Sequence, residues 1–268
     1  MLAQIIITII LALIQGIAEW LPISSTAHLK IAETFLGFHA TPLFNVFLHL
    51  GTLGVVLFYF RRDIKTILKC LFRKDFHSEY GRFIPLIVVA TIPTGIIGLL
   101  YDKYLADSYQ TFLIIGVTFI VGACLLIASR FAKESQTKIS YRKALLMGTA
   151  QGAASFPGLS RSGSTISTGL LQGVTREMVF KFSFLLSIPA ILGDLVVEAY
   201  LQRGTFSQGV GVNPLDLAVG LIVSAIAGYF SILLVKRFVL SNRFHYFAFY
   251  TLPLGIVLIA LALLFGLK

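Results

Sequence analysis

Two polar segments inside a very apolar chain carry most of the side chains that could do chemistry. The first segment, QGIAEWLPISSTAHL at 15–29, contains the ionisable residues Glu19 and His28. The second segment, QGAASFPGLSRSGSTIS at 151–167, contains Arg161. Ionisable groups are costly in an apolar or membrane interior, so they usually mark a binding site or an ion path. We therefore place the candidate site in these two segments.

The two segments share one pattern. Each opens with Gln-Gly, at Gln15 and Gln151, reaches a proline at Pro22 or Pro157, and continues into a run of hydroxyl side chains. Paired, broken segments at matching positions in two halves of a membrane protein are typical of a site at the interface between internal repeats. The sequence therefore predicts a duplicated chain with one site between its two copies.

The residue types of both segments suit the binding of an anion. The hydroxyl run Ser24–Thr26 follows Pro22, a residue that favours the first turn of a helix. A helix that starts there points free N–H groups towards the loop, and such groups bind anions. In the second segment, Arg161 offers a planar set of donors that suits phosphate oxygens. The alternative is that Arg161 only pairs with Glu19 and holds the two segments together.

The composition places the whole chain in the membrane class. Of its 268 residues, 57% are apolar and 13% are charged, and the mean hydropathy is +0.88. The net charge of +10 would suggest nucleic acid in a soluble protein, but here the basic residues first serve membrane topology, and no nucleic-acid partner is expected. The two cysteines, Cys70 and Cys124, imply neither a disulfide framework nor a metal site.

We expect an all-α polytopic membrane protein with six transmembrane helices and two re-entrant helical hairpins. Apolar runs long enough to cross a bilayer lie at 43–60, 83–101, 110–130, 178–200, 214–235 and 245–266. Proline and glycine interrupt two further stretches, at 2–30 and 144–170. Each of these two is predicted to enter and leave the membrane on one side, under cover of protein or a wet cavity.

The basic residues set the orientation. Most of the 22 Lys and Arg residues fall in four connections assigned to the cytoplasmic side, of which the longest is a loop at 61–82. Both termini are then outside, and the odd number of crossings in each half inverts the second copy relative to the first. We expect one membrane domain, 1–268, with a first repeat at 1–135 and an inverted repeat at 136–268.

Several motifs in order make the chain similar to a known family over essentially its full length. They are EWLPISSTAH from Glu19 to His28, HLGTL from His49 to Leu53, PGLSRSGST from Pro157 to Thr165, and FSFLLSIP from Phe182 to Pro189. With these motifs the chain resembles the undecaprenyl-diphosphate phosphatase family, also called the bacitracin-resistance protein family.

The resemblance implies an activity and a set of catalytic residues. Members remove the terminal phosphate from an undecaprenyl-type polyprenyl diphosphate and yield the monophosphate carrier lipid of envelope glycan assembly, at a site open to the outer face of the cell membrane. The family's acidic pair maps onto Gln15 and Glu19, its serine nucleophile onto Ser25, its histidine onto His28 and its arginine onto Arg161. Gln15 departs from the glutamate of many members, and an amide cannot act as a base.

We therefore expect the diphosphate to be held by Arg161 and loop N–H groups while Ser25 attacks the terminal phosphorus or positions water, and His28 or Glu19 handles the proton. The expected substrate-binding residues are Gln15, Ser24, Thr26, Gly158, Ser160, Ser162, Gly163 and Thr165. A divalent cation, Mg²⁺ or Ca²⁺, is expected to bridge the phosphates, with Glu19 as its protein ligand. A homodimer is possible.

Three alternatives stay open at this point. Inverted repeats with broken helices are also typical of transporters, so the chain could move polyprenyl phosphate lipid across the bilayer. His49 is as well explained by a hydrogen-bonded packing role as by a role in the site. Asp194 and Glu198 could line the lipid entrance or, as we favour, simply lie at the membrane interface.

Overall fold

The structure is a computed structural model that describes residues 2–38, 40–106, 111–135, 138–201 and 213–266. Apart from one isolated bridge residue, all regular secondary structure in these ranges is helical, as predicted. The helices of the first half are α1 (Leu2–Trp20), α2 (Ser25–Leu36), α3 (Pro42–Tyr59), α4 (Arg61–Phe72), α5 (Phe83–Tyr104) and α6 (Phe112–Ser129). Those of the second half are α7 (Tyr141–Ala153), α8 (Arg161–Leu171), α9 (Arg176–Leu201), α11 (Pro214–Leu240), the 3-10 helix η1 (Phe244–Phe247) and α12 (Ala248–Phe265).

Side-chain caps define where many of these helices begin. Thr41, Thr111, Ser140, Ser160 and Asn213 each accept a hydrogen bond from a backbone N–H in the first turn of the following helix. Such caps satisfy donors that a helix leaves free at its start. The cap at Ser160 places Arg161 at the first position of α8, so the sequence itself fixes this arginine at a helix N-terminus.

The apolar helices agree with a protein that spans a membrane several times. Within the described ranges, five helices are long and apolar enough to cross a bilayer, or up to six if α3 and α4 count as one bent span. The axes of α3 and α4 differ by 76°. We had predicted a loop at 61–82, and this is wrong for its first part, because α4 forms there.

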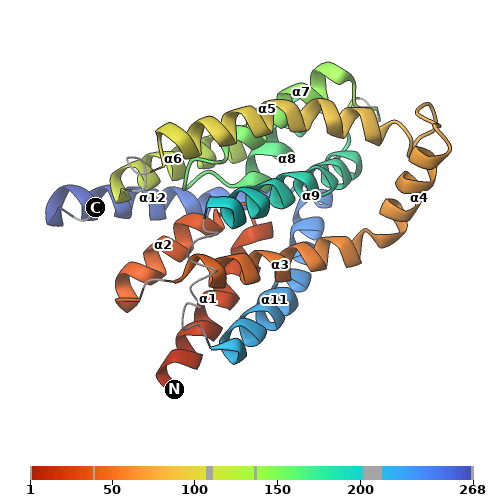
Figure 1. Cartoon of the computed structure of the whole chain (residues 1–268). Coiled ribbons are helices and arrows are strands. Elements are labelled where there is room, and N and C mark those ends of the chain that lie inside the picture. The colour runs from red at the N-terminus through yellow and green to blue at the C-terminus, as the bar shows by residue number, and fades with distance from the viewer. Residues whose placement is uncertain (1, 39, 107–110, 136–137, 202–212, 267–268) are drawn as a thin grey trace.

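The helices pack as antiparallel or crossing neighbours, and the short helix α8 lies among them near the centre (Figure 1). The closest pairs are α6 with α12, α1 with α11, α3 with α11, and α5 with α7, and α8 packs against α6, α7 and α9. Small residues allow these close approaches, as in other membrane bundles. At the α6–α12 crossing, Gly116 and Gly255 face each other's backbone.

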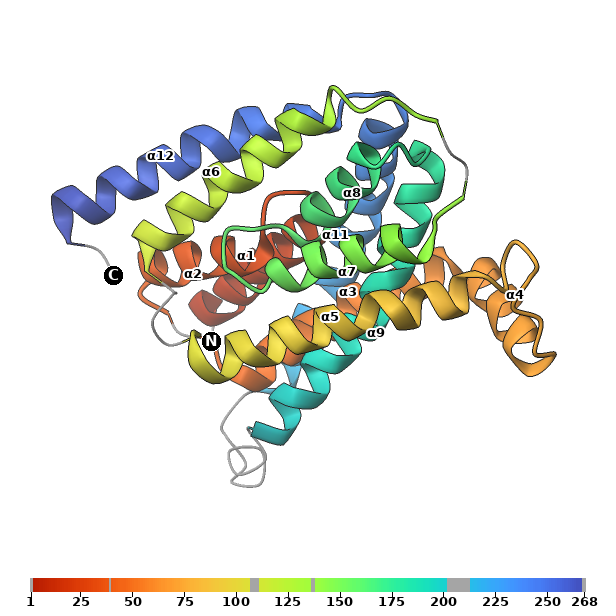
Figure 2. The same ribbon diagram turned by 90° about the horizontal axis from the view of Figure 1, so that it is seen from above.

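The breaks within the two polar segments meet in the middle of the bundle (Figure 2). The first break lies between the end of α1 and Ser25, and the second lies between the end of α7 and Arg161. The backbone N–H of Gly158 donates to Ser24 Oγ at 3.0 Å, and Ser160 Oγ donates to the Leu21 carbonyl at 3.2 Å. Non-helical backbone in each polar segment is thus paired with the other polar segment, as burial of backbone groups in an apolar interior requires.

We predict that Gly148→Ala destabilises the fold. A Cβ at Gly148 of α7 would overlap the Ala90 carbonyl of α5, where Thr94 Oγ1 also donates to the Gly148 carbonyl at 2.8 Å. Overpacking of this kind costs about 1–3 kcal/mol. Thermal unfolding of the purified protein in detergent measures it, with Gly95→Ala as control because no atom lies within 4 Å of a Cβ there. Equal melting temperatures for the two variants would contradict the α5–α7 packing.

Candidate active site

The centre of the site is the carboxylate of Glu19, which is buried in the last turn of α1. Ser25, the first residue of α2, donates its hydroxyl hydrogen to Glu19 Oε2 at 2.7 Å. Gln15, one turn earlier on α1, donates from Nε2 to the same oxygen at 3.0 Å. A serine hydroxyl that donates to a carboxylate has its oxygen lone pairs free and a base in place. Ser25 and Glu19 therefore have the arrangement of a nucleophile and its general base.

Arg161 approaches the same carboxylate from the second segment. Its NH1 lies 3.6 Å from Glu19 Oε1, and its NH2 donates to Asp194 Oδ2 at 2.7 Å. NH1 is buried and has no hydrogen-bond partner among the described residues. A buried donor usually has a partner, so NH1 is available to an incoming ligand oxygen. The ion pair with Glu19 that we considered as an alternative does exist, and it leaves this donor free.

Gln15 links Glu19 to His49 of α3. Its Nε2 lies 3.1 Å from His49 Nδ1 as well as 3.0 Å from Glu19 Oε2, so one amide group serves both side chains. His49 Nδ1 is also 3.8 Å from Glu19 Oε2. The amide at position 15 thus acts as a hydrogen-bond donor that orients the carboxylate. It also brings His49 beside Glu19, a contact that fits both roles considered for this histidine.

A pocket of about 350 Å³ opens beside this group. His49 and Asp194 line it, so they connect the open pocket to buried Glu19 and Arg161. Its other polar lining residues are Thr26, Lys30, Glu33, Asn45 and Glu198. Glu19 and Arg161 themselves line a void of about 10 Å³ together with Ser162, Ser183 and Ser187. The polar groups therefore form a continuous path from the pocket to the buried carboxylate.

Apart from Gln15, which contacts Glu19 and His49, the expected substrate-binding residues fall into two groups. Thr26 and Ser162 line the pocket and the void. The others make contacts that hold the two segments in place: Ser24 with Gly158, Ser160 with Leu21 and Gly163, and Thr165 with the Arg161 carbonyl and Ser183. Ser24 itself has a φ of 67°, which is unfavourable for a residue with a side chain. Phosphate binding by either group stays a prediction.

His28 points away from the Glu19 carboxylate. Its Nδ1 lies 2.8 Å from the Ser24 carbonyl and its Nε2 lies 2.7 Å from the Tyr250 hydroxyl on α12. The ring also packs against Phe119 of α6 and stacks on Tyr250. Because a carbonyl only accepts, Nδ1 carries a hydrogen and a neutral ring accepts from Tyr250 at Nε2. His28 thus holds the strained backbone next to Ser25, and its contacts do not favour the proton-transfer role that we had considered.

Sequence reasoning missed two partners of the site. Tyr250 lies in an apolar run, where no neighbouring residue marks it as a partner of His28. Asp194 was noticed as an acid within an apolar span, but we favoured a place at the membrane interface. In the structure Asp194 forms an ion pair with Arg161 and lines the pocket together with Glu198, and its place at the membrane interface stays a prediction.

Comparison with known proteins agrees with this geometry. The sequence model of the family described as Bacitracin resistance protein BacA matches residues 8–257, a range that includes both polar segments. The chain belongs to this family. An undecaprenyl-diphosphatase of Methanobrevibacter smithii is 35% identical over 270 residues, 95% of this chain and 96% of the relative. An undecaprenyl-diphosphatase of Korarchaeum cryptofilum is 36% identical over 94% of this chain and 97% of the relative. An undecaprenyl-diphosphatase of Treponema denticola is 40% identical over 92% of this chain and 94% of the relative.

The binding of a divalent cation stays a prediction. Among the described residues, no group of three or more His, Cys, Asp or Glu side chains is placed to hold a metal ion. Mg²⁺ is often bound by one or two carboxylates together with substrate phosphates. The hydrogen bonds from Gln15 and Ser25 go to Oε2 of Glu19, while Oε1 lies 3.6 Å from Arg161 NH1, so Oε1 fits such a shared site once a phosphate is present.

We predict that His28→Asn retains far more activity than His28→Ala. The asparagine amide can donate to the Ser24 carbonyl in place of Nδ1–H, but it cannot transfer a proton at neutral pH. The measurement is kcat/KM for phosphate release as a function of pH. If His28 positions the loop, the Asn variant keeps the wild-type pH profile; equal loss in both variants would instead indicate that the imidazole takes part in proton transfer.

Proposed function

We propose that this protein hydrolyses an undecaprenyl-type polyprenyl diphosphate to the monophosphate and inorganic phosphate, and so recycles the lipid carrier for envelope glycan synthesis. The observation that carries the proposal is the hydrogen bond from Ser25 Oγ to buried Glu19, with a free Arg161 donor beside it. Relatives that share at least 35% of aligned residues over nearly the whole chain are named undecaprenyl-diphosphatase.

The first step forms a bond between Ser25 Oγ and the terminal phosphorus. Glu19 takes the hydroxyl proton, to which it is already hydrogen-bonded at 2.7 Å. The bond from phosphorus to the bridging oxygen breaks, and its electron pair leaves with the lipid monophosphate. Arg161 NH1 donates to the equatorial oxygens of the transferring group, where charge stabilisation carries most of the rate in phosphoryl transfer.

The second step releases inorganic phosphate. Once Glu19 has passed its proton to solvent, it takes a proton from a water molecule that attacks the phosphoserine. The bond between phosphorus and Ser25 Oγ then breaks, and the serine oxygen regains the proton from Glu19. One carboxylate thus serves both steps in turn. A second carboxylate at position 15 is not needed, since the Gln15 amide only orients Glu19 and His49.

The substrate diphosphate occupies the pocket of about 350 Å³. Lys30, Thr26 and His49 line this pocket and face the phosphate that stays on the lipid. Ser25 and Arg161 begin α2 and α8, so two helix N-termini add backbone N–H groups to the same end of the site. A bound Mg²⁺ or Ca²⁺ would neutralise phosphate charge, with Glu19 as its protein ligand.

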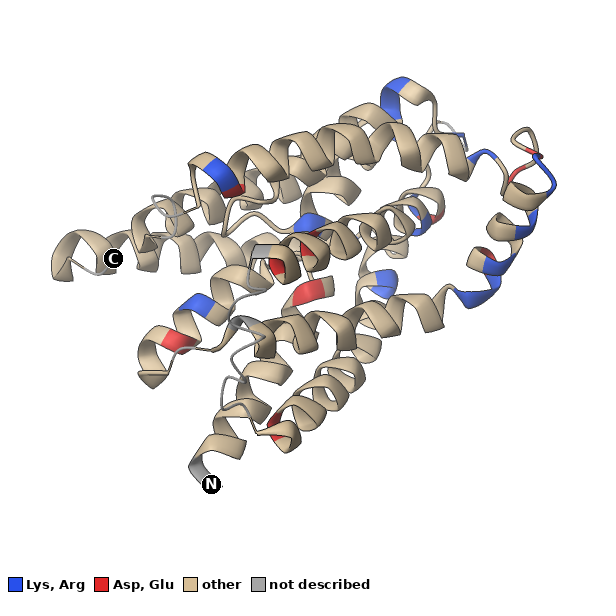
Figure 3. Cartoon of the chain, in the orientation of Figure 1, with Lys and Arg blue, Asp and Glu red and all other residues tan. Residues whose placement is uncertain are grey.

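The membrane arrangement that supports this function has six spans and two re-entrant hairpins in inverted repeats, 1–135 and 136–268. Lys and Arg gather on α4 and at the start of α7, while α1 starts and α12 ends at the far side of the molecule (Figure 3). Since basic residues favour the cytoplasmic side, both termini lie outside. The pocket is then open to the outer face of the cell membrane, where the lipid diphosphate is released.

A transporter of the carrier lipid fits the site less well. Transport requires a charged clamp and two alternating openings, but it does not require a hydroxyl held against a buried carboxylate. The Ser25–Glu19 hydrogen bond and the names of the relatives both favour the enzyme. We therefore do not propose transport.

We predict that Ser25→Ala and Arg161→Ala each abolish phosphate release from undecaprenyl diphosphate by purified protein. Loss of the nucleophile or of the charge that stabilises the transferring group should lower kcat by at least about 100-fold. Thr34→Ala is the matched control, because Thr34 is an exposed hydroxyl on the same helix as Ser25 and bonds only to the Lys30 carbonyl. Assays with and without Mg²⁺ or Ca²⁺ test the cation. Unchanged turnover in both variants would remove the basis of the proposal.

A further inference from the structure

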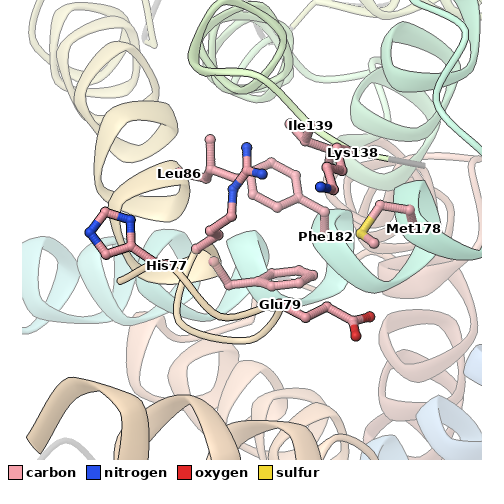
Figure 4. A pocket seen from close by; sticks show the side chains of 9 residues that line it. His77, Glu79, Leu86, Lys138, Ile139, Met178 and Phe182 are labelled. Atoms are coloured by element: carbon pink, nitrogen blue, oxygen red, sulfur yellow. The ribbon is translucent and has the colours of Figure 1, made fainter. Parts of the chain in front are cut away.

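A second pocket, of about 290 Å³, is lined by residues that follow α4 and precede or begin α5, α7 and α9, none of which lines the pockets at Glu19 (Figure 4). Its apolar walls come from the starts of α5 and α9 and from the connection before α7. Phe83, Leu86, Phe182 and Ile139 line it with side chains that are themselves buried in the core. The rings of Phe83 and Phe182 pack with centroids 6.0 Å apart. The pocket is therefore preformed by rigid core packing.

Positive side chains surround the mouth of this pocket. Arg82 and Lys138 line it together with His77, and Glu79 is the one acid in its lining. The amino group of Lys138 points towards the centre of the lining residues, whereas the carboxylate of Glu79 points away (Figure 4). Neither Arg82 nor Lys138 forms a salt bridge within the described part of the chain. By contrast, the neighbouring Lys181 pairs with Asp63 at 2.9 Å.

The connection that carries His77 and Glu79 has a defined shape. Asp75 Oδ1 accepts the backbone N–H groups of His77 and Ser78 at 3.1 and 3.0 Å. Hydrogen bonds from the side chain and backbone of Ser78, and from the backbone of His77, lower the pKa of the Asp75 carboxyl. The Gly81 N–H donates to Ser78 Oγ at 3.2 Å. The mouth of the pocket is thus held by local hydrogen bonds.

The neighbouring helix α4 places the pocket at the level of the lipid headgroups. α4 has no buried residue, carries four basic side chains, and exposes Leu68, Leu71 and Phe72, the last at 84%. It turns 76° away from α3. A basic amphipathic helix with exposed apolar residues lies in the plane of the membrane interface. The pocket beside it is therefore within reach of bilayer lipids.

We propose that this pocket binds the headgroup of an anionic glycerophospholipid from the leaflet on the basic side. Arg82 and Lys138 contact its phosphate, and an acyl chain follows the exposed apolar face of α5 at Val88 and Ile92. The two unpaired cations supply the charge complementarity. The apolar walls distinguish this occupant from a free anion, which would gain nothing from them. The proposal is independent of the hydrolysis of the diphosphate at the site around Glu19.

The test is native mass spectrometry of the full chain in detergent, with dioleoyl phosphatidylglycerol and dioleoyl phosphatidylcholine titrated in turn. We expect at least about tenfold tighter binding of the first phosphatidylglycerol than of phosphatidylcholine, a difference that the double variant Arg82→Gln, Lys138→Gln abolishes. The matched control is Lys133→Gln, Arg142→Gln, which removes two exposed positive charges outside the pocket. It should bind like the wild type.

Three outcomes would overturn the proposal. The first is equal binding of the two lipids by the wild type. The second is equal loss of phosphatidylglycerol binding in the pocket and control variants, which would indicate a general effect of net charge. The third is thermal stabilisation by inorganic phosphate alone that matches stabilisation by phosphatidylglycerol at the same concentration, which would indicate a free-anion site. Melting temperatures in phosphatidylcholine alone verify that both variants fold.

Discussion

One buried carboxylate constrains much of this structure. Glu19 lies in the centre of an apolar helical bundle, where an unpaired charge would cost several kcal/mol. Its partners Gln15, Ser25, His49 and Arg161 come from four different helices, α1, α2, α3 and α8. Satisfying this single charge therefore fixes the relative positions of both polar segments and of α3. The same contacts that stabilise the charge also assemble a nucleophile, a base and a cationic donor.

The two broken segments also contain backbone groups that have no hydrogen-bond partner within a helix. At the breaks, each loop supplies the partners of the other, through Ser24 with Gly158 and Ser160 with Leu21. The breaks in turn create the two helix N-termini at which Ser25 and Arg161 lie. The pairing of backbone groups and the proposed binding of an anion thus have one structural cause, namely that α2 and α8 begin at loops that contact each other.

Much of this arrangement could be predicted from the sequence because it depends on local patterns. Apolar length predicted the long helices, proline and glycine predicted the breaks, and intramembrane charges predicted Glu19 and Arg161 as the centre of the site. The sequence did not predict the helix α4, because its charged residues hid the amphipathic spacing of its apolar residues. The basic pattern of 61–82 indicated only topology, although half of that stretch is helical.

Contacts across long sequence separations could not be predicted in the same way. His28 was singled out as an ionisable residue that could handle the proton, but its hydrogen bond to Tyr250, 222 positions along the chain, has no signal in the sequence. Asp194 likewise forms its ion pair with Arg161 because it lies on the face of α9 that turns towards this arginine. Such choices depend on helix rotation and tertiary packing, which residue spacing alone does not determine.

The central claim is that Ser25, with its proton held by Glu19, forms a covalent bond to the terminal phosphorus. Acid quenching of the protein during turnover of terminally radiolabelled undecaprenyl diphosphate, followed by peptide mapping, tests this claim directly. The account predicts label on the peptide that contains Ser25, and loss of that label in Glu19→Gln. Steady phosphate release with no labelled serine at any quench time would contradict it and would make water, not Ser25, the attacking group.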